Sequence, residues 1–181
     1  MKKDNVLEQA FTLVAQLGWS DFKITDLLEK DLDLDLIILK QRFRCKEDLL
    51  KEMLSYIDAQ VFDLVGIAKD ETSSLKECLF ELIMIRLEVL SRYKETIHSL
   101  CNNFSNYSLS LYFLQEGFYS AYWMLEISGV DLNGIKGMMK SFVFFISYLL
   151  IIFKWLKGEI EDESEQMFFV NKMINKLIPY F

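Results

Sequence analysis

The sequence predicts an all-α protein, and three observations support that fold class. Apolar residues recur every three or four positions over most of the chain, which is the spacing of amphipathic helices. One proline and seven glycines interrupt 181 residues, and the alternating patterns typical of strands are scarce. Hydrophobic residues make up 52% of the chain, so it has enough apolar surface to bury a sizeable core and to stay ordered.

The N-terminal segment is expected to begin with a helix over residues 4–17, where apolar side chains share one face. Gly18 follows the last of them and should end this helix. The next large apolar residues, Trp19 and Phe22, are expected to be core residues at the base of the segment. A short helix should follow, with Thr25 near its start either as an N-terminal cap or as a contact to a phosphate.

A run of aspartates alternating with leucines, residues 31–35, separates that short helix from the next one. One of these aspartates is expected to cap the helix that starts at Leu36, because helix N-termini favour a negative side chain. A longer helix should then run from Lys46 to about residue 66. Two short helices joined by a tight elbow and followed by a third have the outline of a helix-turn-helix unit.

The rest of the chain is expected to form a larger helical body. Residues 69–73 are a polar break, and Ser74 followed three residues later by Glu77 is the signature of a capping box. The helix after it, over residues 75–90, is apolar around most of its circumference and should lie in the centre of the body. A shorter helix is expected over residues 95–102.

An aromatic band follows, and it is a candidate ligand pocket. Large rings beside methionine side chains can line an adaptable apolar cavity. The same residues also suit an ordinary core, and His98, the single histidine, also suits a structural role, so both interpretations stay open at this point. The candidate ligand-binding residues are Met84, His98, Phe104, Phe118, Tyr119, Tyr122 and Trp123.

The most apolar helix is expected over residues 133–157, and Gly158 should end it. Its apolar side chains form two stripes, which implies that one side faces the core and the other side faces a partner subunit. A last helix is expected over residues 162–178, and the two helices together should form the contact with the partner. The candidate homodimer interface consists of Phe142, Phe145, Leu149, Ile152, Phe153 and Leu156. The most hydrophobic run, residues 141–153, is shorter than the roughly 20 residues that a bilayer requires, so no membrane span is expected.

The net charge of −7 and the lack of catalytic motifs limit the function classes. The first fifty residues hold eight basic and ten acidic side chains, an unusual balance for a segment that binds phosphates. The sequence contains no Gly-rich phosphate loop, nucleophile motif or metal-ligand pattern, so we expect no enzyme activity, metal or cofactor. Three well-separated cysteines and an N-terminus without an apolar leader favour a reducing compartment, the cytoplasm.

One motif at the end of the second short helix points to a known family. Phe43, Lys46, Glu47, Leu49 and Leu50 form the pattern F-x-x-K-E-x-L-L, which resembles the end of the DNA-binding domain of TetR-type bacterial regulators, and residues 6–19 are similar to that family's first helix. The resemblance implies a helix-turn-helix domain at residues 1–47 and a helical ligand-binding and dimerisation domain at residues 48–181. It also implies a transcriptional regulator that binds double-stranded DNA as a homodimer and responds to a small apolar effector. The candidate DNA-binding residues are Thr25, Lys40, Gln41, Arg42, Arg44 and Lys46.

Other stretches are similar to a second family with the same fold. LGWSDF, DLDLDL and RFRCKEDLL, together with RLEVL at residues 86–90 and Tyr122-Trp123, resemble the TetR-folded lipid-binding accessory proteins of ubiquinone biosynthesis. That resemblance implies a carrier of lipid or isoprenoid quinone that does not bind DNA. Lys40 stands where TetR regulators usually have Tyr, and the aspartates of the elbow would face a DNA backbone unfavourably. The sequence therefore leaves both functions open.

Overall fold

The computed structural model describes residues 2–29, 35–68, 74–103 and 107–181. Within these residues the chain forms eight α-helices and two short 3-10 helices, and no strand. The predicted all-α class is confirmed. The chain divides into two compact units, Met1–Ala59 with Arg92–Phe113 (unit 1) and Gln60–Ser91 with Leu114–Phe181 (unit 2). The division into functional domains at residues 1–47 and 48–181 stays a prediction, because compactness groups residues by contact and not by function.

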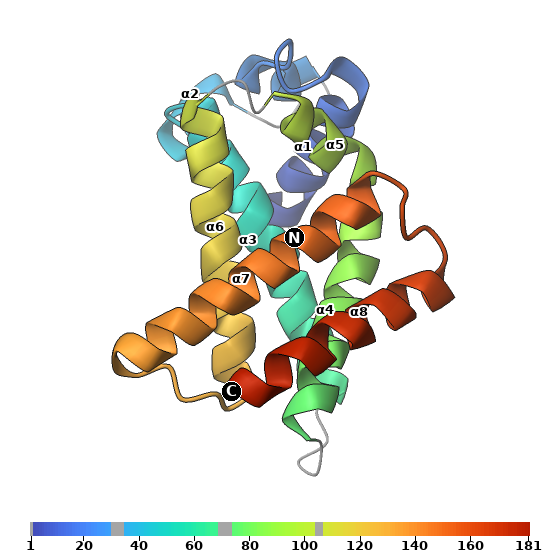
Figure 1. The fold of residues 1–181 in the computed structure, drawn as a ribbon. Coiled ribbons are helices and arrows are strands. Elements are labelled where there is room, and N and C mark those ends of the chain that lie inside the picture. The colour runs from blue at the N-terminus through green and yellow to red at the C-terminus, as the bar shows by residue number, and fades with distance from the viewer. Residues whose placement is uncertain (1, 30–34, 69–73, 104–106) are drawn as a thin grey trace. The chain divides into compact units, whose positions relative to one another are not determined.

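Unit 1 contains α1 (Lys2–Leu17), the 3-10 helix η1 (Ile24–Glu29), α2 (Leu36–Arg42), the first part of α3 (Lys46–Ala68) and α5 (Lys94–Asn102). In this unit α1 packs against both η1 and α5 (Figure 1). Gly18 ends α1 with φ +81°, a conformation that favours glycine, and its N–H donates to the Val14 carbonyl at 3.0 Å.

The link between α1 and α5 rests on polar contacts as well as on apolar packing. The Trp19 N–H donates to Ser99 Oγ at 2.8 Å, and Thr96 Oγ1 donates to the Phe11 carbonyl at 2.7 Å. Trp19 and Phe22 are both buried, as predicted for the base of the segment. These contacts give unit 1 a fixed core that positions η1 and α2 at its surface.

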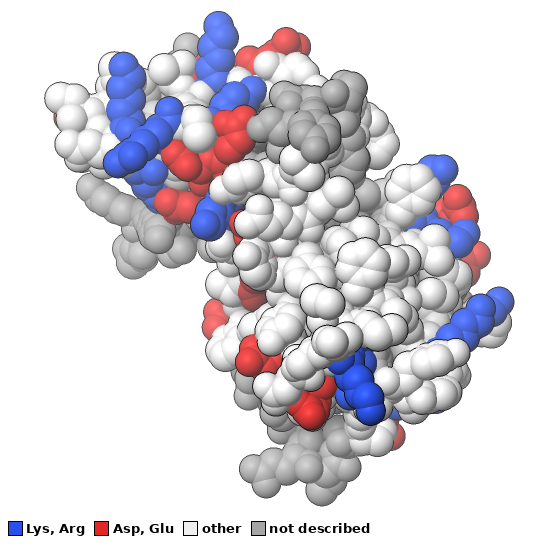
Figure 2. Space-filling model, turned by 60° about the vertical axis from the view of Figure 1, so that its left-hand side comes forward, with Lys and Arg blue, Asp and Glu red and all other residues white. Residues whose placement is uncertain are grey.

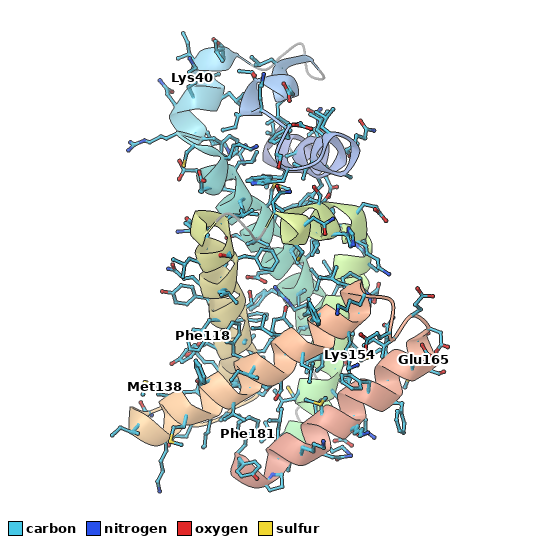
Figure 3. All side chains as sticks on the ribbon, turned by 45° about the horizontal axis from the view of Figure 1, so that its top comes forward. Lys40, Phe118, Met138, Lys154, Glu165 and Phe181 are labelled. Atoms are coloured by element: carbon cyan, nitrogen blue, oxygen red, sulfur yellow. The ribbon has the colours of Figure 1, made fainter. Side chains whose placement is uncertain are left out.

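Unit 2 contains α4 (Leu75–Ser91), most of α6 (Tyr107–Ile127), α7 (Gly134–Leu156), α8 (Glu163–Leu177) and the 3-10 helix η2 (Ile178–Tyr180). Here α8 packs against both α4 and α7, and α7 and α8 lie side by side in Figures 1 and 3. The predicted capping box at the start of α4 is confirmed. Glu77 Oε2 accepts from the Ser74 N–H at 2.8 Å and from Ser74 Oγ at 2.7 Å, and the Glu77 N–H donates back to Ser74 Oγ.

Among the described residues, the core of unit 2 contains one buried cation, Arg86 of α4. Its Nε donates to the Tyr148 hydroxyl of α7, and its Nη2 donates to Ser120 Oγ of α6 at 3.2 Å. A buried guanidinium is tolerated where hydrogen bonds replace its hydration. The apolar pattern of residues 75–90 gave no sign of this polar contact among three helices.

The helix α7 is 23 residues long and is, among the described residues, the one helix that is long and apolar enough to cross a membrane. Length and composition alone are weak evidence for a span, because the core helix of a soluble protein meets the same two criteria. One face of α7 is buried inside unit 2, including Phe144, Tyr148, Ile151 and Trp155.

Candidate nucleic-acid interface and associated sites

The helix α2 is held in place by a cap and two buried side chains. Asp35 is its N-cap, and Asp35 Oδ1 accepts a hydrogen bond from the Ile37 N–H at 2.9 Å. The prediction that an aspartate of the 31–35 run caps this helix is therefore confirmed, while residues 31–34 lie outside the described residues. Leu39 and Phe43 are 1% and 2% exposed and anchor one side of α2 in unit 1. The opposite side consequently faces solvent.

The outward face of α2 begins with three exposed apolar side chains. Leu36, Ile37 and Ile38 are 39%, 64% and 60% exposed. Lys40 and Gln41 follow them and are exposed as well, and Figure 3 shows Lys40 at the outer surface of α2. This face therefore combines apolar groups, one cation and one amide.

Arg42, a predicted DNA-binding residue, forms an ion pair within unit 1. Its Nη2 lies 2.5 Å from Glu52 Oε2 of α3, and its Nε donates to the same carboxylate at 3.1 Å. The guanidinium also lies 4.8 Å from the centre of the Phe43 ring. Because Glu52 neutralises the guanidinium, Arg42 contributes little positive charge to the surface in this arrangement.

Lys46 is held beneath the loop that follows α1. Its Nζ donates to the Trp19 carbonyl and lies 4.8 Å from the centre of the Trp19 ring. The side chain is half-buried, and this desolvation lowers the pKa of the ammonium. Lys46 thus fastens the start of α3 to the core of unit 1.

The other predicted DNA-binding residues, Thr25 and Arg44, are exposed. The Arg44 N–H donates to Asp48 Oδ2 at 2.9 Å, which fixes the backbone while the guanidinium stays at the surface. At the start of η1, the Lys23 N–H donates to Asp26 Oδ2 at 2.7 Å, so a capping role belongs to Asp26. Figure 2 shows basic and acidic side chains interleaved where Lys and Arg gather.

The candidate ligand-binding residues that the structure describes belong to both units. His98 is exposed on α5 of unit 1, where its Nδ1 lies 3.1 Å from Asn102 Nδ2. Tyr119 and Tyr122 of α6 are 57% and 37% exposed, and Phe104 lies outside the described residues.

Two further rings of that set take part in aromatic contacts inside unit 2. Phe118 forms an edge-to-face pair with Phe145 of α7 at 5.4 Å between ring centres. Trp123 lies 5.7 Å from the ring of Phe62. Figure 3 shows Phe118 on the side of α6 that faces α7. These two rings therefore pack between helices of unit 2.

Met84, the last residue of that set, lines a groove of about 770 Å³ along α4 and α8 in unit 2. Apolar side chains of Phe80, Ile85 and Trp155 line it together with Met84. Five glutamates also line it: Glu77, Glu81, Glu88, Glu161 and Glu163. A groove of several hundred cubic ångströms lined by apolar and polar side chains has the size of a small-molecule site. Sequence reasoning did not foresee this groove, because its lining comes from three separate segments of the chain.

A stripe of exposed apolar side chains runs along α7 on the side opposite its buried face. We call it the α7 stripe, and its members are Ile135, Met138, Met139, Phe142, Val143, Ile146, Leu150 and Phe153. Figure 2 shows a broad area without charged side chains in the part of the molecule formed by α6 and α7. Isolated exposed apolar residues are ordinary, but a continuous stripe of this length marks an interaction surface.

The predicted dimer residues fall on both faces of α7. Phe142 and Phe153 belong to the α7 stripe, and Leu149 and Leu156 are half-buried. Phe145 and Ile152 are 7% and 8% exposed and lie in the core of unit 2. The structure thus separates the two stripes that periodicity alone could not assign.

No group of three or more His, Cys, Asp or Glu side chains that could hold a metal ion occurs in the part of the chain that the structure describes. No protein-family model and no curated protein matches the sequence. Among solved structures, the crystal structure of the TetR transcriptional regulator from Nitrosomonas europaea ATCC 19718 is similar, with a TM-score of 0.75 over 98% of both chains. The two sequences are 17% identical, so the likeness shows the fold, which is that of TetR.

Proposed function

We propose that this protein is a TetR-like transcriptional regulator that acts in the cytoplasm and binds double-stranded DNA as a homodimer. The observation that carries the proposal is α2: a capped helix, anchored by Leu39 and Phe43, whose outward face is free of any other described element in a fold of the TetR type. In a helix-turn-helix protein the second helix enters the major groove, so α2 supplies the base contacts. The comparison with the Nitrosomonas regulator supports this function through the fold alone.

We call the helix-turn-helix domain at residues 1–47 the head, and its exposed cations supply the contacts to the DNA backbone. Lys40 and Arg44 are exposed, and Thr25 offers a hydroxyl at the surface of η1. Arg42 and Lys46 remain candidates from the sequence, but the ion pair with Glu52 and the burial beside Trp19 make both weaker donors to phosphate. The head therefore makes few charged contacts to the backbone, and we expect a moderate dependence of its affinity on salt.

The α7 stripe supports the homodimer. In TetR-like regulators two heads must be held together to reach two half-sites of one operator. A twofold contact joins the same patch on both subunits, and a helix with a long apolar face can pair with its own copy. The stripe provides such a patch, centred on Phe142 and Ile146.

The groove along α4 and α8 is our proposed effector site. It offers Phe80, Met84, Ile85 and Trp155 to an apolar body, and five glutamates line the same groove. A ligand that binds one arrangement of the helices better than another shifts the population of the two arrangements. A small apolar effector in this groove would thereby control the affinity for DNA.

A titration of DNA binding against salt tests the proposal. Lys40 and Arg44 from both subunits would give the dimer about four charged contacts, so log K should fall with log salt at a slope of about −3 to −4. Replacing Lys40 and Arg44 together with alanine should remove most of the binding. The same double change at Lys172 and Lys176, which are exposed on α8, is the control and should leave the slope unchanged.

Binding of DNA by the wild-type protein at low salt is the decisive measurement for the proposed function. Fluorescence anisotropy with genomic fragments should show binding at about 50 mM salt. If no binding is seen under these conditions, the proposed function is wrong, and the lipid-carrier hypothesis on the same fold would have to be tested by extraction and mass spectrometry of bound lipid.

A further inference from the structure

We propose that α2 recognises the methyl groups of thymine, so that the operator of this protein carries thymine at the base pairs that face Ile37 and Ile38. The inference rests on the proposed function and specifies the class of DNA sequence that the same site reads. Leu36, Ile37 and Ile38 are the first three residues of α2, and all three are exposed. The N-terminal residues of a recognition helix are the ones that contact base edges.

The exposure of these side chains is imposed by the position of the helix. Leu39 and Phe43 occupy the inward side of α2 and are almost fully buried. A rotation of α2 that buried Ile37 or Ile38 would expose Leu39, so the two sets cannot both be inside. The first turn of α2 consequently presents branched apolar groups and no side-chain hydrogen-bond donor to a partner.

The major groove offers one apolar group that such side chains can contact. Guanine, cytosine and adenine present donors and acceptors there, whereas thymine adds a C5-methyl group. An isoleucine placed against the polar edges of a G·C pair displaces water without replacing its hydrogen bonds. The same isoleucine against a thymine methyl buries apolar surface on both sides. Discrimination in favour of thymine follows.

Gln41 points to the same kind of operator. It is exposed on α2 beyond this first turn, and a glutamine amide pairs with the N6 and N7 groups of adenine. The carboxylate of Asp35 is the other polar group near the first turn, and its Oδ1 already accepts from the Ile37 N–H. A half-site rich in A·T pairs thus fits both the apolar and the amide groups of this face.

The test compares one operator with and without the thymine methyl groups. The wild-type homodimer first selects its preferred sequence from a random pool of duplexes, and that operator is then synthesised with deoxyuridine in place of thymidine. Uracil keeps the O4 acceptor and lacks only the methyl group. Each lost methyl contact should weaken binding about fourfold, and the loss of one contact in each of the two half-sites should weaken it about fifteenfold.

Two variants sharpen the comparison. Replacing Ile37 and Ile38 together with alanine should abolish the difference between the thymidine and deoxyuridine operators. Lys40→Ala is the matched control on the same helix, and it should weaken binding to both operators by the same factor. Should the double variant fail to fold, as judged by circular dichroism, the two-operator comparison with wild-type protein decides alone.

Failure of the inference differs from failure of the proposed function. If the wild type binds no DNA at low salt, both are overturned. If it binds DNA but the selected pool shows no enrichment of thymine, or if both operators bind equally well, the thymine inference is overturned and DNA binding stands.

Discussion

Cys101 lies on α5 in the half-buried layer of unit 1, and burial raises the pKa of its thiol from 9.0 to about 11. A thiolate is charged, so a low-dielectric surrounding favours the protonated form. Cys45, in contrast, is exposed at the start of α3. The two thiols should therefore differ in reactivity toward alkylating reagents, with Cys45 modified first.

The raised pKa of Cys101 predicts a loss of stability in alkaline solution. Below the ordinary pKa of 9.0, the thiol is protonated in both the folded and unfolded chain and has no effect on the balance. As the pH rises toward about 11, the unfolded chain loses the proton first, so the folded state becomes less favourable. Urea unfolding midpoints at about pH 8 and about pH 10.5 should fall further for the wild type than for Cys101→Ala. Equal losses in the two proteins would contradict this account.

The pairing of Arg42 with Glu52 joins two elements, α2 and α3. A single bidentate contact of this kind fixes the end of α2 against the longer helix and at the same time neutralises a cation next to the proposed DNA-binding surface. The ion pair is thus expected to make α2 more rigid and to weaken the attraction to DNA. The charge near a phosphate at this position therefore depends on Glu52 of α3 as well as on Arg42.

Releasing Arg42 should strengthen DNA binding. In Glu52→Gln the guanidinium loses its carboxylate partner and becomes available to the backbone of the DNA. Two additional contacts per dimer would steepen the slope of log K against log salt by about 1.8. Glu47→Gln changes the head by the same charge without touching this pair and serves as the control. An increase in affinity no larger than that of Glu47→Gln would show that Arg42 does not reach a phosphate.

At the scale of the whole molecule, the α7 stripe is a long apolar surface that is exposed in the single chain. Its side chains lie on the face of α7 opposite to Phe144, Tyr148 and Trp155, which are buried within unit 2. A protein that left such a stripe in water would be prone to association. The proposed pairing with a second copy of the chain would remove the stripe from solvent and hold two heads in one molecule.

Ile146→Asp should therefore yield a folded monomer. Ile146 is 53% exposed in the middle of the α7 stripe, so a carboxylate there is compatible with the fold of one chain but not with an apolar dimer contact. Sedimentation at micromolar concentration should show a dimer for the wild type and a monomer for the variant, with unchanged circular dichroism. Ser55→Asp, an exposed change on α3, is the control and should remain dimeric.

A contrasting substitution separates association from folding. Ile152→Asp introduces a charge at a buried position of the same helix, and it should reduce stability by several kcal/mol and yield insoluble protein. A wild-type chain that sediments as a monomer would rule out the dimer and, with it, the proposed arrangement of two heads.

Helix limits in this protein are determined by the sequence itself. The helix expected over residues 133–157 is found at Gly134–Leu156, and the one expected over residues 162–178 is found at Glu163–Leu177. Ser74 and Glu77 form their capping box, and Asp35 caps α2. Such features depend on hydrogen bonds between residues a few positions apart and on the period of apolar side chains, and both are local properties of the chain.

Only the tertiary structure shows which face of each helix is buried and which charged side chains are paired. Periodicity showed two apolar stripes on residues 133–157, but only the packing of Phe118 against Phe145 and of Arg86 against Tyr148 shows which stripe is inside. The sequence likewise suggested that Arg42 and Lys46 are available to DNA. In the structure Arg42 pairs with Glu52, and Lys46 donates to the Trp19 carbonyl. Burial and ion pairing are set by partners far away in sequence, so no local pattern could assign them.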